Sequence, residues 1–332
     1  MKLKKNSKGL FSFMMGKKDN MVVIAGPTAV GKSALGIELA KKLNGEIISA
    51  DSMQIYREMD VGTAKVTAEE MQGIKHHLID IVEPDVNFNV NDYKKKADEV
   101  IEDILSRGKL PIMVGGTGFY IQAVLKDVDF TEEKTDSLLR EYFDKKSSTE
   151  DGRDELYNRL IIIDKDYADT VHKNNIKRVI RALEYNYLTG EKMSVHNKRE
   201  EKREYKYNAA CIFLNDDRSK LYERIDKRVD KMVENGLFEE VKSILDKGIP
   251  RNCTALQAIG YKEAVSYYDN VSDLNRTTEL IKQNTRHYAK RQITWFKREK
   301  DFEEINISDL NYDRDKITDA AMEIINRKCE GM

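Results

Sequence analysis

The chain has 332 residues, more than most single compact domains, so we expect one large α/β domain with an insertion or two domains. Hydrophobic residues make up 40% of it and charged residues 35%, and no stretch approaches the roughly 18 apolar residues that suggest a membrane span. The 57 Lys and Arg nearly balance the 58 Asp and Glu. We therefore expect a soluble protein in which any attraction to a polyanion comes from a local basic face.

Two features favour the cytoplasm. Cys211, Cys253 and Cys329 are odd in number and lack CxxC spacing, so they support neither a disulfide framework nor a zinc module. The basic segment 1–20 contains only a short apolar stretch, which is too short for a convincing secretory signal. We expect residues 1–20 to be a disordered extension.

Strands and helices alternate in the first part of the chain. The apolar run Met21–Ala25 predicts a strand, and a stripe of leucines predicts a helix over Lys32–Leu43. The next predicted elements are strands over Glu46–Ala50, His77–Val82 and Leu110–Val114 and a helix over Asn91–Arg107. This alternation indicates a parallel sheet with helices on both faces, which binds ligands at the carboxyl ends of its strands.

Between Lys126 and Glu204 the strand signal almost disappears, and charged, helix-favouring sequence replaces it. We expect a helical insertion domain over 126–204. Ala209–Leu214 predicts a returning strand, and the helices expected after it are Arg218–Asn235, Leu237–Asp246 and Thr277–Lys300. The predicted α/β core therefore comprises 21–125 and 205–315.

A GxxxxGK[ST] pattern lies between the first strand and its helix, as Gly26-Pro27-Thr28-Ala29-Val30-Gly31-Lys32-Ser33. In this context backbone N–H groups and a helix N-terminus surround a phosphate, the lysine adds a positive charge, and the serine hydroxyl can bind Mg²⁺. A turn that merely connects strand to helix is the weaker alternative. The pattern predicts a phosphate-binding P-loop.

Two further turns follow predicted strands. Asp51 could be a general base, a magnesium ligand or a helix N-cap, and from the residues alone capping is as reasonable as catalysis. The glycines of Gly115-Gly116-Thr117-Gly118 could permit a tight turn or let the backbone approach a ligand closely.

Two segments combine basic residues at helical spacing. Lys177, Arg178 and Arg181 share a helix surface, and residues 286–298 combine basic and aromatic side chains. Such surfaces suit phosphate contact and base stacking. A solvated charged face is the alternative for the first segment, and an ordinary amphipathic helix is favoured for the second on composition alone.

In their order, these segments resemble the tRNA dimethylallyltransferases, also called tRNA isopentenyltransferases, from about Met21 to Lys300. Besides the P-loop, the motifs that carry the resemblance are Asp51-Ser52-Met53-Gln54-Ile55-Tyr56, Asp60-Val61-Gly62-Thr63-Ala64-Lys65, His76-His77-Leu78-Ile79-Asp80, Gly115-Gly116-Thr117-Gly118-Phe119-Tyr120, Arg178-Val179-Ile180-Arg181-Ala182-Leu183-Glu184, Gln257-Ala258-Ile259-Gly260-Tyr261-Lys262-Glu263 and the segment Thr285–Phe296. The resemblance implies a P-loop NTPase-like parallel sheet flanked by helices, with a helical insertion.

The resemblance also implies a reaction: a dimethylallyl group passes from dimethylallyl diphosphate to N6 of the adenosine just 3′ of the anticodon of tRNA. Lys32 and an Mg²⁺ on Ser33 would stabilise the departing diphosphate, with help from Arg224. Asp51 matches the catalytic aspartate that accepts the N6 proton, and Thr117 the threonine beside the adenine and the diphosphate.

Contacts with tRNA are implied for a larger set of residues, and the insertion would grip the anticodon stem-loop. These residues are Asp51, Ser52, Met53, Gln54, Thr117, Lys177, Arg178, Val179, Ile180, Arg181, Gln257 and Gly260, the last two within Ala255–Gly260. We expect a monomer in the cytoplasm that does not bind a membrane.

Three other functions compete with this one. A kinase would share the P-loop, Asp51 and Mg²⁺ and would use Arg224 and Arg228 as phosphate clamps, but it does not explain the later motifs. An isopentenyltransferase acting on free AMP would not need the insertion. A non-catalytic RNA-binding protein would not need Lys32, Ser33, Asp51 and Thr117 together.

Overall fold

The computed structural model describes residues 18–128 and 136–329. Most of the expected extension over 1–20 lies outside the described residues, although Asn20 already belongs to the first strand. The chain forms two compact units. The core unit runs to Leu125 and resumes at Tyr205, and the helical unit comprises Lys126–Glu204, the range that the sequence assigns to an insertion.

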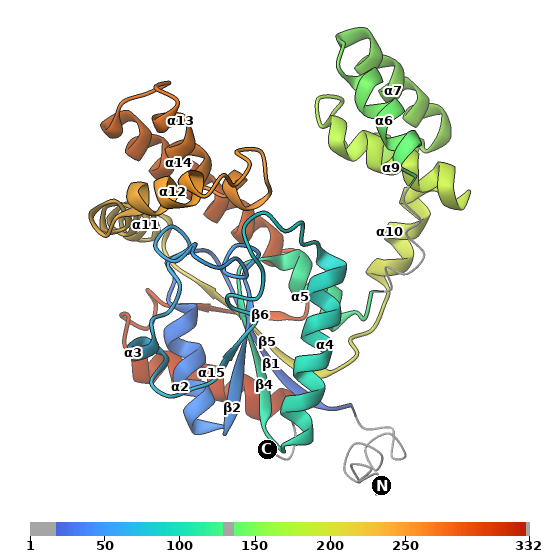
Figure 1. Ribbon diagram of the computed structural model, residues 1–332. Coiled ribbons are helices and arrows are strands. Elements are labelled where there is room, and N and C mark those ends of the chain that lie inside the picture. Colours follow the sequence, from blue (N-terminus) through green and yellow to red (C-terminus); the bar gives the residue numbers. More distant parts are fainter. Residues whose placement is uncertain (1–17, 129–135, 330–332) are drawn as a thin grey trace, which may run out of the picture. The chain divides into compact units, whose positions relative to one another are not determined.

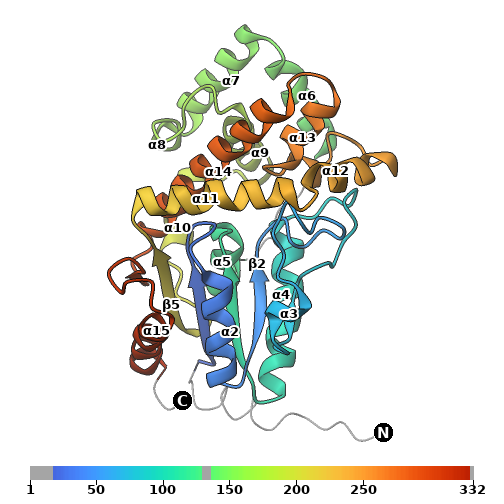
Figure 2. The same cartoon turned by 90° about the vertical axis from the view of Figure 1, so that its left-hand side faces the viewer.

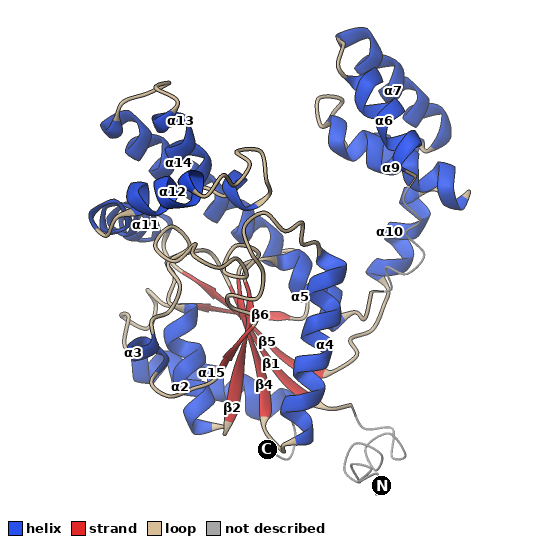
Figure 3. Ribbon diagram, in the orientation of Figure 1, coloured by secondary structure: helices blue, strands red, loops and turns tan. Residues whose placement is uncertain are grey.

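A six-stranded parallel sheet forms the centre of the core unit, which confirms the predicted fold class (Figures 1 and 3). The strands lie in the order β3-β2-β4-β1-β5-β6. Their bounds are β1 Asn20–Ala25, β2 Gly45–Ala50, β3 His76–His77, β4 Leu110–Gly115, β5 Asn208–Asn215 and β6 Phe302–Asn306. Because the strands are parallel, the turns after β1, β2 and β4 lie at the same edge of the sheet, and the position of β4 between β1 and β2 makes these turns neighbours.

Helices cover both faces of the sheet, as the strand periodicity requires (Figure 2). On one face Val22 and Ile24 join the apolar cluster formed with α2 (Lys32–Lys42) and α15 (Arg314–Lys328). On the other face Val23 packs in the cluster formed with α4 (Val90–Ser106) and α5 (Gly118–Leu125). Alternate residues of β1 thus face opposite helix layers, and every residue from Met21 to Ala25 is fully buried.

A further group of helices belongs to the core unit beyond the carboxyl ends of the strands (Figure 1). Its elements are α11 Arg218–Glu234, α12 Leu237–Asp246, the short 3₁₀ helix η1 Ala255–Gln257, α13 Tyr261–Tyr268 and α14 Leu274–Phe296. They enclose a third apolar cluster, which also includes Ile55, Tyr56 and Met59 from the chain after β2. The short helix α3 (Ala68–Met71) follows that segment. Helices α11 and α14 are thereby packed near the strand-end turns.

The helical unit has its own apolar core. Its helices are α6 Ser137–Ser147, α7 Glu150–Ile163, α8 Lys165–Ala168, α9 Ile176–Thr189 and α10 Met193–Glu201. Phe143, Leu156, Leu160 and Leu183 come from three of these helices and are at most 2% exposed. No strand occurs in the described part of this unit, in line with the weak strand signal of the sequence.

Two expectations about the core require correction. The strand predicted over His77–Val82 is wrong, because β3 ends at His77 and both Leu78 (φ 61°) and Asp80 (φ 56°) adopt left-handed conformations that a strand cannot contain. The core unit also continues past residue 315, since α15 packs against β5 and α2. No helix of the described residues has the length and apolar character to span a membrane.

Candidate active site

Three loops meet at the carboxyl edge of the sheet, as predicted. The P-loop follows β1, the Asp51 turn follows β2 and the Thr117 turn follows β4. Thr117 N–H donates to the Ala50 carbonyl at 3.1 Å, and Ser52 N–H donates to Thr117 Oγ1 at 3.1 Å. Direct hydrogen bonds therefore join the turns that contain Asp51 and Thr117.

The P-loop has the backbone of an anion cradle. Gly31 (φ 101°) and Ala29 (φ 64°) take left-handed conformations, and α2 begins directly afterwards at Lys32. No acidic side chain lies in the first turn of α2, so the positive end of the helix dipole is not neutralised there. Lys32 Nζ donates to the Pro27 carbonyl at 2.7 Å, and the Ser33 side chain is exposed. The loop can surround a phosphate group on the side of the helix N-terminus.

Two cations meet at this cradle. Burial lowers the pKa of Lys32 to about 7, and repulsion by Arg228 acts in the same direction, while Asp51 opposes both. Burial also lowers the pKa of Arg228, a residue of α11. Among the described residues, Arg228 Nε finds no hydrogen-bond acceptor. Two shielded cations that repel each other would both be stabilised by an anion bound between them.

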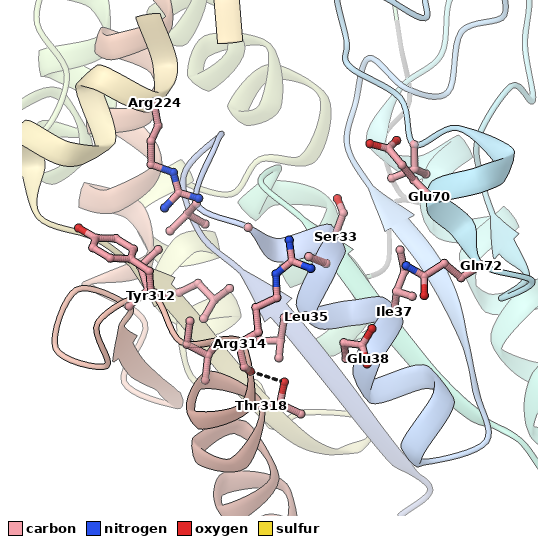
Figure 4. A pocket seen from close by; sticks show the side chains of 17 residues that line it. Ser33, Leu35, Ile37, Glu38, Glu70, Gln72, Arg224, Tyr312, Arg314 and Thr318 are labelled. Atoms are coloured by element: carbon pink, nitrogen blue, oxygen red, sulfur yellow. Dashed lines mark hydrogen bonds between the residues drawn. The ribbon is translucent and has the colours of Figure 1, made fainter. Parts of the chain in front are cut away.

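A cavity of about 350 Å³ lies beside the P-loop (Figure 4). Arg224 extends into it from α11, and Ser33 and Tyr312 line it. Arg224 Nη1 lies 3.3 Å from Asp216 Oδ2, and the Tyr312 hydroxyl donates to Asp216 Oδ1 at 3.1 Å. The Asp216 side chain is fully buried, so it holds Arg224 at the cavity wall.

Asp51 caps the turn after β2 and lies beside two side chains of the site. Its Oδ1 accepts the N–H of Met53 at 2.9 Å and that of Gln54 at 3.4 Å, so it caps the turn. Burial raises the pKa of the Tyr288 phenol, and the charge of Asp51 adds to this rise. A hydrogen bond between Tyr288 and Thr117 acts in the opposite direction. Asp51, Thr117 and Tyr288 are therefore neighbours.

Three residues of this site were not among the predicted site residues. Arg228 was considered only for a kinase, and Tyr288 and Gln292 lie in the basic and aromatic segment that composition assigns to an ordinary amphipathic helix. Gln292 is buried and bonds to both the P-loop and the turn after β4. Tyr288 and Gln292 are four residues apart on α14, which indicates that they share a helix face but not that this face points to the site.

The remaining predicted residues of the core unit differ in their contacts and exposure. Gln54 accepts a hydrogen bond from Ser49 Oγ at 3.2 Å and donates to the Thr63 carbonyl at 3.3 Å. Ser52 and Met53 are half-buried. Gln257 is exposed, whereas Gly260 is buried and has a positive φ of 95°.

In the helical unit, the predicted contact segment on α9 separates into two faces. Lys177 and Arg178 are exposed, and Arg181 is half-buried. Val179 and Ile180 are 0% and 2% exposed and belong to the apolar core of the unit. Packing against α7 and its neighbours removes these two side chains from the surface, so Lys177, Arg178 and Arg181 supply the side chains that this segment presents outward.

Comparison with known proteins identifies the family of the chain. Residues 54–299 match the family model described as IPP transferase. The tRNA dimethylallyltransferase of Lachnoclostridium phytofermentans is 51% identical over 299 residues, which cover 90% of this chain and 95% of the relative. That of Bacillus subtilis is 51% identical over 284 residues, covering 86% and 90%.

The chain is also similar in structure to solved members of this family. The tRNA isopentenylpyrophosphate transferase of Bacillus halodurans superposes with a TM-score of 0.70 at 42% identity, covering 94% of this chain and 98% of that one. A eukaryotic dimethylallyltransferase acting on tRNA gives a TM-score of 0.74 at 35% identity, covering 88% and 75%. The chain is therefore a transferase that belongs to the IPP transferase family and has its P-loop NTPase-like fold.

Proposed function

We propose that the protein transfers a dimethylallyl group from dimethylallyl diphosphate to N6 of the adenosine 3′-adjacent to the anticodon of tRNA, and releases diphosphate. The observation that carries this proposal is the meeting of a cationic phosphate cradle with Asp51 and Thr117 at one sheet edge. The relatives named tRNA dimethylallyltransferases support the choice of donor and acceptor.

The cradle acts on the leaving group. As the allylic C1–O bond breaks, its electron pair and the growing negative charge go to the diphosphate. Lys32, the P-loop amides and Arg228 are arranged to stabilise that charge, and Arg224 approaches from the cavity side. The bound anion raises the pKa of Lys32 again, so this ammonium is charged when the substrate is present.

Asp51 acts on the acceptor. The new bond joins N6 to C1, and the N6 proton passes to the Asp51 carboxylate. The adenine leaves the stack of the anticodon loop to reach the carboxylate, as bases do in other base-modifying enzymes. Thr117 is held between the Asp51 turn and Tyr288 by hydrogen bonds to both, which places its hydroxyl beside the carboxylate that the adenine has to reach.

Mg²⁺ is the cofactor that we propose. Among the described residues, no group of three His, Cys, Asp or Glu side chains could hold a metal alone. The exposed Ser33 hydroxyl at the start of α2 fits an ion that is bound mainly by substrate diphosphate oxygens and water, a common arrangement for Mg²⁺. Such an ion would supply further positive charge to the leaving group.

For recognition of the anticodon stem-loop, we propose the exposed Lys177 and Arg178 of the helical unit, together with Arg181. Cationic side chains of this kind bind phosphates and make affinity depend on salt. We further propose a monomer that works in the cytoplasm, where the three free cysteines would stay reduced.

A labelling experiment tests the reaction. The protein is incubated with labelled dimethylallyl diphosphate and unmodified tRNA, and in parallel with labelled ATP and the same tRNA. We expect prenylated adenosine after nucleoside analysis in the first reaction only. Label that enters tRNA only from ATP would indicate a kinase, and preference for AMP over an anticodon stem-loop would indicate a free-nucleotide enzyme.

A further inference from the structure

Gln292 lies where α14 passes both the P-loop and the turn after β4. Its side chain is only 6% exposed. Its Oε1 accepts the backbone N–H of Thr28 at 3.0 Å, and its Nε2 donates to the backbone carbonyl of Gly116 at 3.1 Å. A single side chain therefore bridges the diphosphate cradle and the turn that contains Thr117.

The surroundings of this bridge leave it little freedom. A Cβ atom on residue 116 would collide with Gln292 Nε2, so glycine allows the backbone to approach the amide closely. On the same helix Ala289 and Phe296 are 0% and 2% exposed, and they belong to the apolar clusters on opposite faces of the sheet. Packing of α14 into both clusters fixes the position of Gln292 between them.

The bridge also requires an amide. Thr28 supplies a donor and Gly116 an acceptor, so the side chain between them must accept at one end and donate at the other. An ionised carboxylate can only accept, and an apolar side chain of similar size can do neither. Either replacement leaves at least one backbone group without this partner, which is costly where water is excluded.

We propose that Gln292 is a positioning residue for prenyl transfer, which holds the P-loop and Thr117 at the separation that transfer requires. This inference rests on the proposed function. Leaving group and nucleophile meet at one carbon atom, and a misplacement of about 1 Å can cost roughly 100-fold in rate. In the proposed function the diphosphate is bound by Lys32, the P-loop amides and Arg228, and these groups all remain when the bridge is lost. Loss of the bridge should therefore lower kcat far more than it raises KM.

The first test compares Gln292→Met with Thr277→Val. Thr277 is 1% exposed on the same helix and donates to the Asp273 carbonyl at 2.7 Å, so its valine variant also loses a buried hydrogen bond. For Gln292→Met we expect kcat to fall by roughly 30- to 100-fold, with KM for dimethylallyl diphosphate within about threefold of wild type. Thr277→Val should keep wild-type kinetics.

Hydrogen exchange supplies a second readout that does not depend on activity. In Gln292→Met, amides of 26–30 and 115–118 should exchange faster than in wild type, because both loops lose the same partner. In Thr277→Val these two segments should be unchanged. If the wild type forms no prenylated adenosine, the proposed function is wrong, whereas this exchange comparison still decides whether Gln292 links the loops.

Gln292→Glu gives a pH-dependent rescue. A buried carboxyl titrates above its ordinary range, and its protonated form again offers one donor and one acceptor. The ratio of variant to wild-type kcat should therefore rise as pH falls from about 8 to about 6. The inference is overturned if Gln292→Met loses no more kcat than Thr277→Val, or if segments 26–30 and 115–118 keep their wild-type exchange rates in Gln292→Met. It is also overturned if the ratio of Gln292→Glu kcat to wild-type kcat does not change with pH.

Discussion

The core unit and the helical unit hold their predicted site residues in different ways. In the core, Lys32, Asp51 and Thr117 come from separate strand-end loops, and hydrogen bonds or charge interactions link them. In the helical unit, Lys177–Arg181 is little more than one turn of α9, with exposed cations beside two core residues. The predicted catalytic residues thus lie on loops that the sheet brings together, whereas the predicted contact segment of α9 has exposed cations on one face and core residues on the other.

The largest effect is expected in the core, from Asp51→Ala. Removing a general base should lower kcat by roughly 10²- to 10⁴-fold, while tRNA affinity stays within about threefold. The measurement is single-turnover prenyl transfer together with a tRNA binding isotherm.

Asp51→Asn separates the two roles of this side chain. The amide oxygen can still accept from Met53 N–H, so the cap persists and the Tm should stay close to that of wild type, while Asp51→Ala also loses about 1 kcal/mol of capping. The asparagine variant should be about as slow as the alanine variant. Wild-type turnover in Asp51→Asn would reduce Asp51 to a structural cap.

The next largest effect concerns the buried face of α9. Ile180→Ala removes a side chain that is 2% exposed and should destabilise the helical unit by about 2–4 kcal/mol. Hydrogen exchange should accelerate in α7 and α9 but not in β1 and β4, because the two units have separate apolar clusters. Tyr187→Ala, at a position 65% exposed on the same helix, is the control and should change little.

The exposed face of α9 should give a smaller effect. Lys177→Gln with Arg178→Gln removes two exposed cations, so tRNA affinity should fall by about tenfold and the slope of log affinity against log salt should decrease by about 1–2. Stability and kcat at saturating tRNA should not change. Lys41→Gln, in the last turn of α2, is the matched control. An unchanged salt slope in the double variant would mean that this face does not bind tRNA.

The fold could be predicted where the residues of a segment determine its structure, and not where tertiary contacts determine it. The buried strands read as apolar runs bounded by turns, so β1, β2, β4 and β5 could be located from the sequence. Strand β6 carries Glu303 and Glu304 at its centre and gave no such run. The third predicted strand failed because tertiary contacts bend the chain after His77, among them the bond from Asp80 N–H to the Gln54 carbonyl.

For the site, proximity could be predicted wherever topology dictates it. The loops after β1, β2 and β4 must share an edge in a parallel sheet, so Lys32, Asp51 and Thr117 could be grouped in advance. Arg228 and Gln292 could not, because the packing of α11 and α14 decides which of their residues face that edge. Helix periodicity alone also did not show that Val179 is buried while Lys177 is exposed, since the burial of each side chain depends on the neighbouring helices.

The smallest expected effect is the uptake of a proton by Lys32 when dimethylallyl diphosphate binds. In the free protein the Lys32 pKa is about 7, so at about pH 8 most molecules carry a neutral amine. Binding of dimethylallyl diphosphate without tRNA raises this pKa, and the complex should take up close to one proton at about pH 8 and almost none below about pH 6. Calorimetry in buffers of different ionisation enthalpy measures the uptake. Lys32→Arg stays charged throughout and should show none, whereas equal uptake in both proteins would mean that the proton binds elsewhere in the cradle.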